Sequence, residues 1–124
     1  MNIIIAEDNV DHSELLEIEL LKYFPSCELL FAQTGEELIQ FLRASAELPD
    51  LILMDIKMPR MNGPETLRHI KRVEQWRSIP IIVNSTSAST HDVNACFELG
   101  ASHYLTKPLQ ADALLRCLKS LDLL

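Results

Sequence analysis

Apolar residues occur in two arrangements that alternate along the chain. Short, largely apolar runs predict strands at residues 2–6, 27–32, 51–54, 79–83 and 102–105. After each run, apolar residues recur with the three- and four-residue spacing of a helix that is buried on one side. The first such helix is predicted at residues 11–23, where Leu16 and Leu20 are four residues apart and Leu15 and Ile18 lie beside them.

Capping residues mark the ends of the later helices. Thr34 begins the second helix, and Glu37 three residues later completes a capping-box pattern. Ser89 or Thr90 begins the fourth helix, and Gly100 ends it. The last helix carries an unbroken apolar stripe of Leu114, Cys117, Leu118 and Leu121.

Five strands that alternate with five helices predict an α/β fold of the (βα)5 type. Because the strands are nearly continuous in apolar residues, they should form a doubly wound parallel sheet with helices on both faces. We expect residues 1–124 to form one domain, since no linker, repeat or low-complexity segment divides the chain. Ligands of such folds bind at the carboxyl ends of the strands, so we expect the functional residues to lie there.

Composition narrows the possible classes of function. The chain has 18 acidic and 11 basic residues, a formal net charge of −7, which disfavours direct DNA binding because DNA-binding proteins need a basic surface. The three cysteines form no CxxC pair and are typical of small core residues in a reduced protein. No signal peptide is recognisable, and no apolar stretch approaches the ~20 residues of a membrane span. We therefore expect a cytoplasmic protein that binds neither DNA nor membranes.

Chemically useful side chains follow four of the five predicted strands. Glu7 and Asp8 follow the first strand, and Asp55 follows the third. If these two strands are neighbours, three carboxylates converge, and carboxylates a few Å apart repel one another by roughly 1 to 4 kcal/mol per pair. A bound cation would relieve this repulsion, and oxygen ligands in an open site suit Mg²⁺.

The fourth and fifth predicted strands end in residues that suit phosphoryl chemistry. Ser85 supplies a hydroxyl and Lys107 an ammonium group. Together with a metal ion, these donors match the charge that develops on the oxygens of a phosphoryl group under attack. Asp55 can then serve both as a metal ligand and as the nucleophile.

The order and spacing of these residues resemble the receiver domain of two-component response regulators, over essentially the whole chain. The residues that carry the resemblance are Glu7-Asp8, Asp55 in LILMDIKMP, the MNG motif at 61–63, Ser85, Tyr104 in GASHYLTKP, and Lys107-Pro108. The resemblance implies a flavodoxin-like sheet with the strand order 2-1-3-4-5.

The resemblance also implies a role for each residue. Asp55 would be the phospho-acceptor. Mg²⁺, with Mn²⁺ as a substitute, would be bound directly by Asp8, Asp55 and the backbone carbonyl of Lys57, and by Glu7 either directly or through water. Lys107 would pair with the phosphoryl group, and Ser85 would hydrogen-bond one of its oxygens. Tyr104 would swing inward as Ser85 moves, and the Lys107-Pro108 peptide bond would be cis.

The implied partners are a sensor histidine kinase or a histidine phosphotransfer protein as donor, and a downstream protein of unknown identity. Phosphorylation would switch the surface formed by the fourth helix, the fifth strand and the fifth helix. The protein would not be an enzyme in the usual sense, because it would catalyse only its own phosphorylation and slow dephosphorylation. We expect a monomer or a weak homodimer.

Two other classes of function remain as alternatives. An aspartate-nucleophile phosphohydrolase needs a second aspartate two residues after the first, and this position is Lys57. A scaffold that acts without phosphorylation is disfavoured by the intact set of Glu7, Asp8, Asp55, Ser85 and Lys107.

Three positions either differ from the residues usual in receiver domains or lie where side chains adjust the lifetime of the phosphoryl group. Thr86 stands where receiver domains usually carry a smaller residue, and Lys57 stands where side chains commonly adjust the lifetime of the phosphoryl group. Asn84 replaces an apolar strand residue, and we expect its amide to hydrogen-bond a neighbouring loop. The four histidines show no ligand spacing, so a phosphodonor histidine must come from a partner.

Overall fold

The computed structural model describes residues 1–124. The strands are β1 (Asn2–Ala6), β2 (Glu28–Ala32), β3 (Leu51–Met54), β4 (Ile81–Ser85) and β5 (His103–Thr106). The helices are α1 (Val10–Tyr23), α2 (Gly35–Ala44), α3 (Gly63–Arg72), α4 (Thr90–Glu98) and α5 (Ala111–Ser120), with a short 3-10 helix η1 (Glu74–Trp76) after α3. All strand pairs are parallel and follow the order β2-β1-β3-β4-β5, which confirms the predicted topology.

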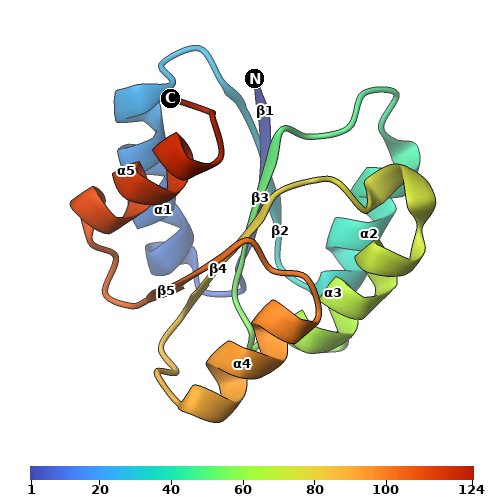
Figure 1. Ribbon diagram of the computed structural model, residues 1–124. Helices are drawn as coiled ribbons and strands as arrows, with labels where there is room; N and C mark the ends of the chain where they lie inside the picture. Colours follow the sequence, from blue (N-terminus) through green and yellow to red (C-terminus); the bar gives the residue numbers. More distant parts are fainter.

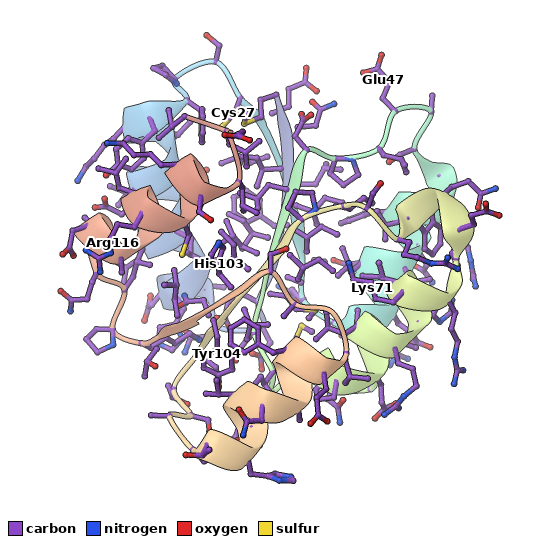
Figure 2. All side chains as sticks on the ribbon, viewed as in Figure 1. Cys27, Glu47, Lys71, His103, Tyr104 and Arg116 are labelled. Atoms are coloured by element: carbon purple, nitrogen blue, oxygen red, sulfur yellow. The ribbon has the colours of Figure 1, made fainter.

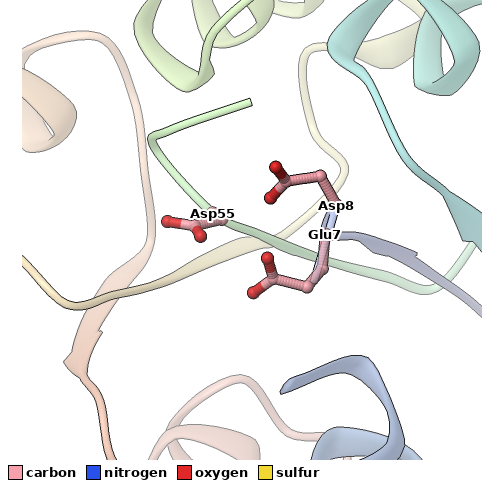
Figure 3. Close-up of side chains that lie close together, drawn as sticks. All are labelled: Glu7, Asp8 and Asp55. Carbon is pink, nitrogen blue, oxygen red and sulfur yellow. The ribbon is translucent and has the colours of Figure 1, made fainter. Parts of the chain in front are cut away.

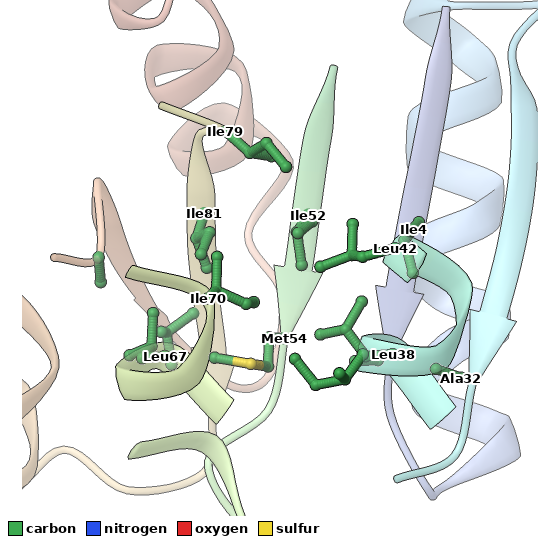
Figure 4. Close-up of a cluster of buried hydrophobic side chains, with 14 of the residues drawn as sticks. Ile4, Ala32, Leu38, Leu42, Ile52, Met54, Leu67, Ile70, Ile79 and Ile81 are labelled. Carbon is green, nitrogen blue, oxygen red and sulfur yellow. The ribbon is translucent and has the colours of Figure 1, made fainter. Parts of the chain in front are cut away.

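Helices cover both faces of the sheet, as predicted. Helices α1 and α5 lie on one face, and α2, α3 and α4 lie on the other (Figure 1). Successive residues of β3 point to opposite faces, so Ile52 and Met54 join the larger apolar cluster while Leu51 and Leu53 join the smaller one. Figure 4 shows the larger cluster, packed between the sheet and helices α2 and α3.

Two local predictions need correction. Leu16 and Leu20 of α1 are buried, but Leu15 and Ile18 are 51% and 55% exposed, because they lie on the side of the helix that faces away from the sheet. The fourth strand begins at Ile81 rather than residue 79 and extends to Ser85. Pro80 lacks the N–H that a strand residue would donate, although its carbonyl accepts a hydrogen bond from Ile52 N.

The predicted helix boundaries agree well with the structure. Thr34 caps α2 by accepting a hydrogen bond from Glu37 N, and Ser89, one of the two candidates, caps α4. Gly100 follows α4 with φ of 106°, a conformation that favours glycine. No helix has the length and apolar character needed to cross a membrane.

Candidate functional site

Three carboxylates meet at the carboxyl end of the sheet because β1 and β3 are adjacent and in register. Ala6 pairs with Met54, so the next residues, Glu7 and Asp55, emerge at the same level. One oxygen each from Glu7, Asp8 and Asp55 lies within 4.8 Å of the others. Figure 3 shows the three side chains lying close together at the strand ends. This oxygen-rich cluster fits a hard divalent cation such as Mg²⁺.

The cluster is electrostatically costly. Glu7 and Asp55 are 5% and 8% exposed, whereas Asp8 is exposed to solvent. Burial, together with the nearby charge of Asp55, raises the pKa of Glu7 to about 7, although the hydrogen bond from Lys107 acts in the opposite direction. A second positive charge at this site would therefore favour the ionised form of Glu7.

Lys107 joins the acidic cluster, as its position after the fifth strand led us to expect. Its Nζ donates hydrogen bonds to Glu7 Oε1 at 2.5 Å and to Asp55 Oδ2 at 3.0 Å. The Lys107 side chain is only 7% exposed. Glu7 and Asp55 thus share one buried ammonium group.

His12 is a contact that the sequence did not lead us to expect. Its Nδ1 lies 2.8 Å from Lys107 Nζ and 3.8 Å from Glu7 Oε1. His12 occupies the first turn of α1, shortly after the acidic pair. Its closeness to Glu7-Asp8 along the chain was the available signal, but a lone histidine has no recognisable spacing.

The loop after β3 holds Asp55 in place. Asp55 Oδ1 accepts hydrogen bonds from the backbone N–H groups of Ile56, at 2.7 Å, and Lys57, at 3.4 Å. Gly63 allows this loop to pack against the start of α3, because a Cβ there would lie 2.8 Å from the carbonyl oxygen of Asp55. Gly63 N also donates to Ile56 O at 2.7 Å. The Lys57 side chain is exposed at the rim of the site.

Ser85, Thr86 and Tyr104 lie at the neighbouring strand ends. Ser85 is fully buried, and its Oγ accepts a hydrogen bond from Ser87 N at 3.2 Å. The Tyr104 hydroxyl donates to the carbonyl oxygen of Ser87 at 2.7 Å, and burial raises the pKa of that hydroxyl. Figure 2 shows Tyr104 beside α4. Ser85 and Tyr104 therefore contact the same residue of the β4–α4 loop, while Thr86 is exposed.

The structure also tests two further expectations. The Lys107-Pro108 peptide bond is cis, as predicted. Asn84 is buried, but its Oδ1 has no hydrogen-bond partner, so the predicted bond to a neighbouring loop is wrong for that oxygen. Asn84 lines a cavity of about 280 Å³ together with His12, Thr86, Lys107 and Pro108.

Comparisons with known proteins agree with this geometry. The family model described as the response regulator receiver domain matches residues 3–119. Response regulator Rcp1 of Synechocystis sp. is 30% identical over 125 residues, which cover 97% of this chain and 85% of the relative. The Mn²⁺-bound structure of Rcp1 has a TM-score of 0.80 at 29% identity and covers 98% of this chain and 91% of its own.

Two further solved structures are similar. The phosphorylated cyanobacterial phytochrome response regulator RcpA has a TM-score of 0.83 at 30% identity, over 98% of this chain and 90% of that one. The receiver domain of sensor histidine kinase PA1611 from Pseudomonas aeruginosa, with a magnesium ion in its active site cleft, has a TM-score of 0.79 at 28% identity, over 98% and 97% of the two chains. Of the three solved structures described above, two hold a divalent cation.

Proposed function

The chain belongs to the response regulator receiver domain family, and from this premise we propose that Asp55 accepts a phosphoryl group from a partner's phosphohistidine. The donor would be a sensor histidine kinase or a histidine phosphotransfer protein. The observation that carries the proposal is the environment of Asp55, a buried carboxylate that lies among two other carboxylates and bonds to a buried ammonium. Residues 1–124 would act as one receiver domain.

The proposed transfer uses side chains at the carboxyl end of the sheet. An Asp55 carboxylate oxygen attacks phosphorus and forms the new P–O bond, while the P–N bond of the phosphohistidine breaks and its electron pair returns to the imidazole. Lys107 balances charge on the phosphoryl oxygens, and the Ser85 hydroxyl donates a hydrogen bond to one of them. Dephosphorylation is a separate step, in which water attacks phosphorus, the bond between phosphorus and the Asp55 oxygen breaks, and inorganic phosphate leaves the regenerated carboxylate.

Glu7, Asp8 and Asp55 would hold Mg²⁺ or Mn²⁺ through their side chains, with the Lys57 backbone carbonyl as a further ligand. The bound cation would supply charge neutralisation for the phosphoryl group and relieve repulsion within the cluster. Support comes from the close approach of the three carboxylates and from the metal ions in similar structures.

Output would depend on the β4–α4 loop. Phosphorylation of Asp55 would draw the Ser85 hydroxyl toward the new dianionic group, because the phosphoryl oxygens accept strong hydrogen bonds. Ser85 and Tyr104 both contact Ser87, so movement of Ser85 would change the position of Tyr104. The surface of α4, β5 and α5 would then bind a downstream protein other than DNA, with the chain as a monomer or weak homodimer.

The test is phosphoryl uptake from phosphorylated kinases and phosphotransfer proteins in the presence of Mg²⁺, followed by intact mass and peptide mapping. We expect one phosphoryl group on the wild-type chain and none on Asp55→Asn. Asp112→Asn, which removes an exposed carboxylate of α5, is the matched control and should behave like the wild type. Equal uptake by Asp55→Asn would overturn the assignment of the acceptor. No uptake by the wild type from any donor would instead favour the scaffold alternative.

A further inference from the structure

His12 lies beside Lys107 although neither the metal site nor the phosphoryl acceptor requires it. We propose that His12 is a positioning residue for the phosphoryl-transfer reaction: its Nδ1 accepts a hydrogen bond from the Lys107 ammonium and fixes the direction of that group. The inference rests on the proposed function of Asp55. It is carried by the 2.8 Å distance between His12 Nδ1 and Lys107 Nζ.

The chemistry of the two groups decides the direction of the hydrogen bond. A lysine ammonium has three N–H donors and no acceptor. His12 Nδ1 must therefore be the acceptor, which leaves the proton of the neutral ring on Nε2. Glu7 Oε1, Asp55 Oδ2 and His12 Nδ1 together take the three donors of Lys107.

The three acceptors of Lys107 differ in what else they do. Glu7 is a proposed metal ligand, and Asp55 is the proposed nucleophile, so both engage other groups during the reaction. His12 has no other proposed task and can keep its bond to Lys107 throughout. A neutral acceptor also orients the ammonium without cancelling its charge, which stays available for the phosphoryl oxygens.

The surroundings of His12 make it a position that can be substituted without disrupting the core. Its side chain is 35% exposed, and its ring lines the cavity of about 280 Å³ that also contacts Asn84 and Thr86. The side chain of asparagine is smaller than that of histidine, and leucine is similar to histidine in volume, so this partly exposed position beside a cavity can hold either one. Asn Oδ1 stands at the same number of bonds from Cα as His Nδ1, so asparagine keeps an acceptor where leucine has none.

The experiment compares His12→Asn with His12→Leu, using acetyl phosphate as the donor and saturating Mg²⁺. We expect His12→Leu to slow phosphorylation of Asp55 by about tenfold, the loss typical of one hydrogen bond to a charged group. His12→Asn should stay within about threefold of the wild type, because it restores the acceptor. Gln40→Leu, at an exposed position in α2, is the control for introducing leucine and should leave the rate unchanged.

A second comparison tests whether His12 acts through Lys107. In a Lys107→Met background, His12→Leu should cause no further loss of rate, because the group that it orients is absent. Equal rates for His12→Leu and His12→Asn, or an undiminished effect of His12→Leu without Lys107, would overturn the positioning role alone. A wild-type chain that takes up no phosphoryl group on Asp55, either from acetyl phosphate or from phosphorylated kinases and phosphotransfer proteins, would overturn the proposed function as well, so the two failures are distinguishable.

Discussion

Two aspartates flank strand β3 and occupy opposite environments. Asp50, just before the strand, is exposed, and its Oδ2 accepts one hydrogen bond from the backbone N–H of Asn2 at 2.8 Å. Asp55, just after the strand, is 8% exposed and shares a buried ammonium with Glu7. Asp50 hydrogen-bonds the start of β1, whereas Asp55 belongs to a cluster of three carboxylates with one ammonium group.

The difference teaches how a parallel sheet can give one of two similar residues an unusual environment. Both aspartates adjoin the same four buried residues, so their local sequence alone does not distinguish them. The neighbouring strands do, because β1 brings Glu7 to the carboxyl end of β3 and the segment after β5 brings Lys107. The environment of Asp55 therefore depends on residues that are 48 to 52 positions away in the chain.

Removal of the shared ammonium should have the largest effect. In the absence of divalent cations, Lys107→Met should lower the free energy of unfolding by about 3 kcal/mol, because it leaves two buried carboxylates without a counter-charge. Urea denaturation at about pH 8 measures this change. Lys119→Met, at an exposed position in α5, should change stability by less than about 0.5 kcal/mol. Similar losses for the two variants would mean that Lys107 does not neutralise the cluster.

Stabilisation by divalent cations should depend on Asp55 at one end of β3 and not on Asp50 at the other end. Mg²⁺ at a hundredfold excess over its dissociation constant should raise the free energy of unfolding by about 2.7 kcal/mol. The gain should persist in Asp50→Asn and be mostly lost in Asp55→Asn, because only Asp55 belongs to the carboxylate cluster. Thermal or urea unfolding with and without Mg²⁺ measures this gain. A full gain in Asp55→Asn would place the cation elsewhere.

The pH dependence of the free energy of unfolding should show that the pKa of the Glu7 carboxyl is raised in the folded state. The fold raises the pKa of Glu7 from 4.5 to about 7, so the folded state binds more protons than the unfolded state between these values. The contribution of Glu7 to the free energy of unfolding should therefore fall by roughly 2 to 3 kcal/mol as pH rises from 4.5 to 7 and stay constant above that range.

Other groups titrate in the same range, so the informative quantity is the difference between the wild type and Glu7→Gln. Without divalent cations, the wild type should lose stability relative to Glu7→Gln as pH rises through this interval. Saturating Mg²⁺ should remove most of the difference at the upper end, because it stabilises the ionised carboxylate. A difference that stays flat with pH would show that Glu7 ionises normally.

The sequence was sufficient to predict the features that depend on the apolar pattern of one element or on the residues that directly follow one strand. The sheet order came from resemblance, and the meeting of Glu7, Asp8 and Asp55 followed from adjacent parallel strands. The sequence was not sufficient to predict burial where neighbouring apolar residues of one helix lie on different sides of it. Leu15 and Leu16 are adjacent leucines in α1, yet only Leu16 faces the sheet.

The contacts of His12 and Asn84 were also missed, for a different reason. His12 contacts Lys107, which lies 95 positions later in the chain. A single histidine forms no sequence motif from which this contact could be predicted. Asn84 was expected to find a partner because buried amides usually do, but Oδ1 has none within the protein. Both outcomes depend on tertiary packing at the carboxyl end of the sheet, which periodicity does not encode.

The smallest expected effects concern the rim around Asp55, where Thr86 and Lys57 are exposed. We predict that both side chains hinder water from reaching the phosphorylated Asp55, so that Thr86→Ala and Lys57→Ala each speed dephosphorylation by about fivefold, or about 1 kcal/mol of activation free energy. Decay of the phosphorylated protein after removal of the donor measures this rate. Lys22→Ala, at an exposed position of α1, is the control and should leave the decay unchanged. Unchanged decay in both rim variants would show that the lifetime is set by the buried groups around Asp55 and not by the residues that surround its opening.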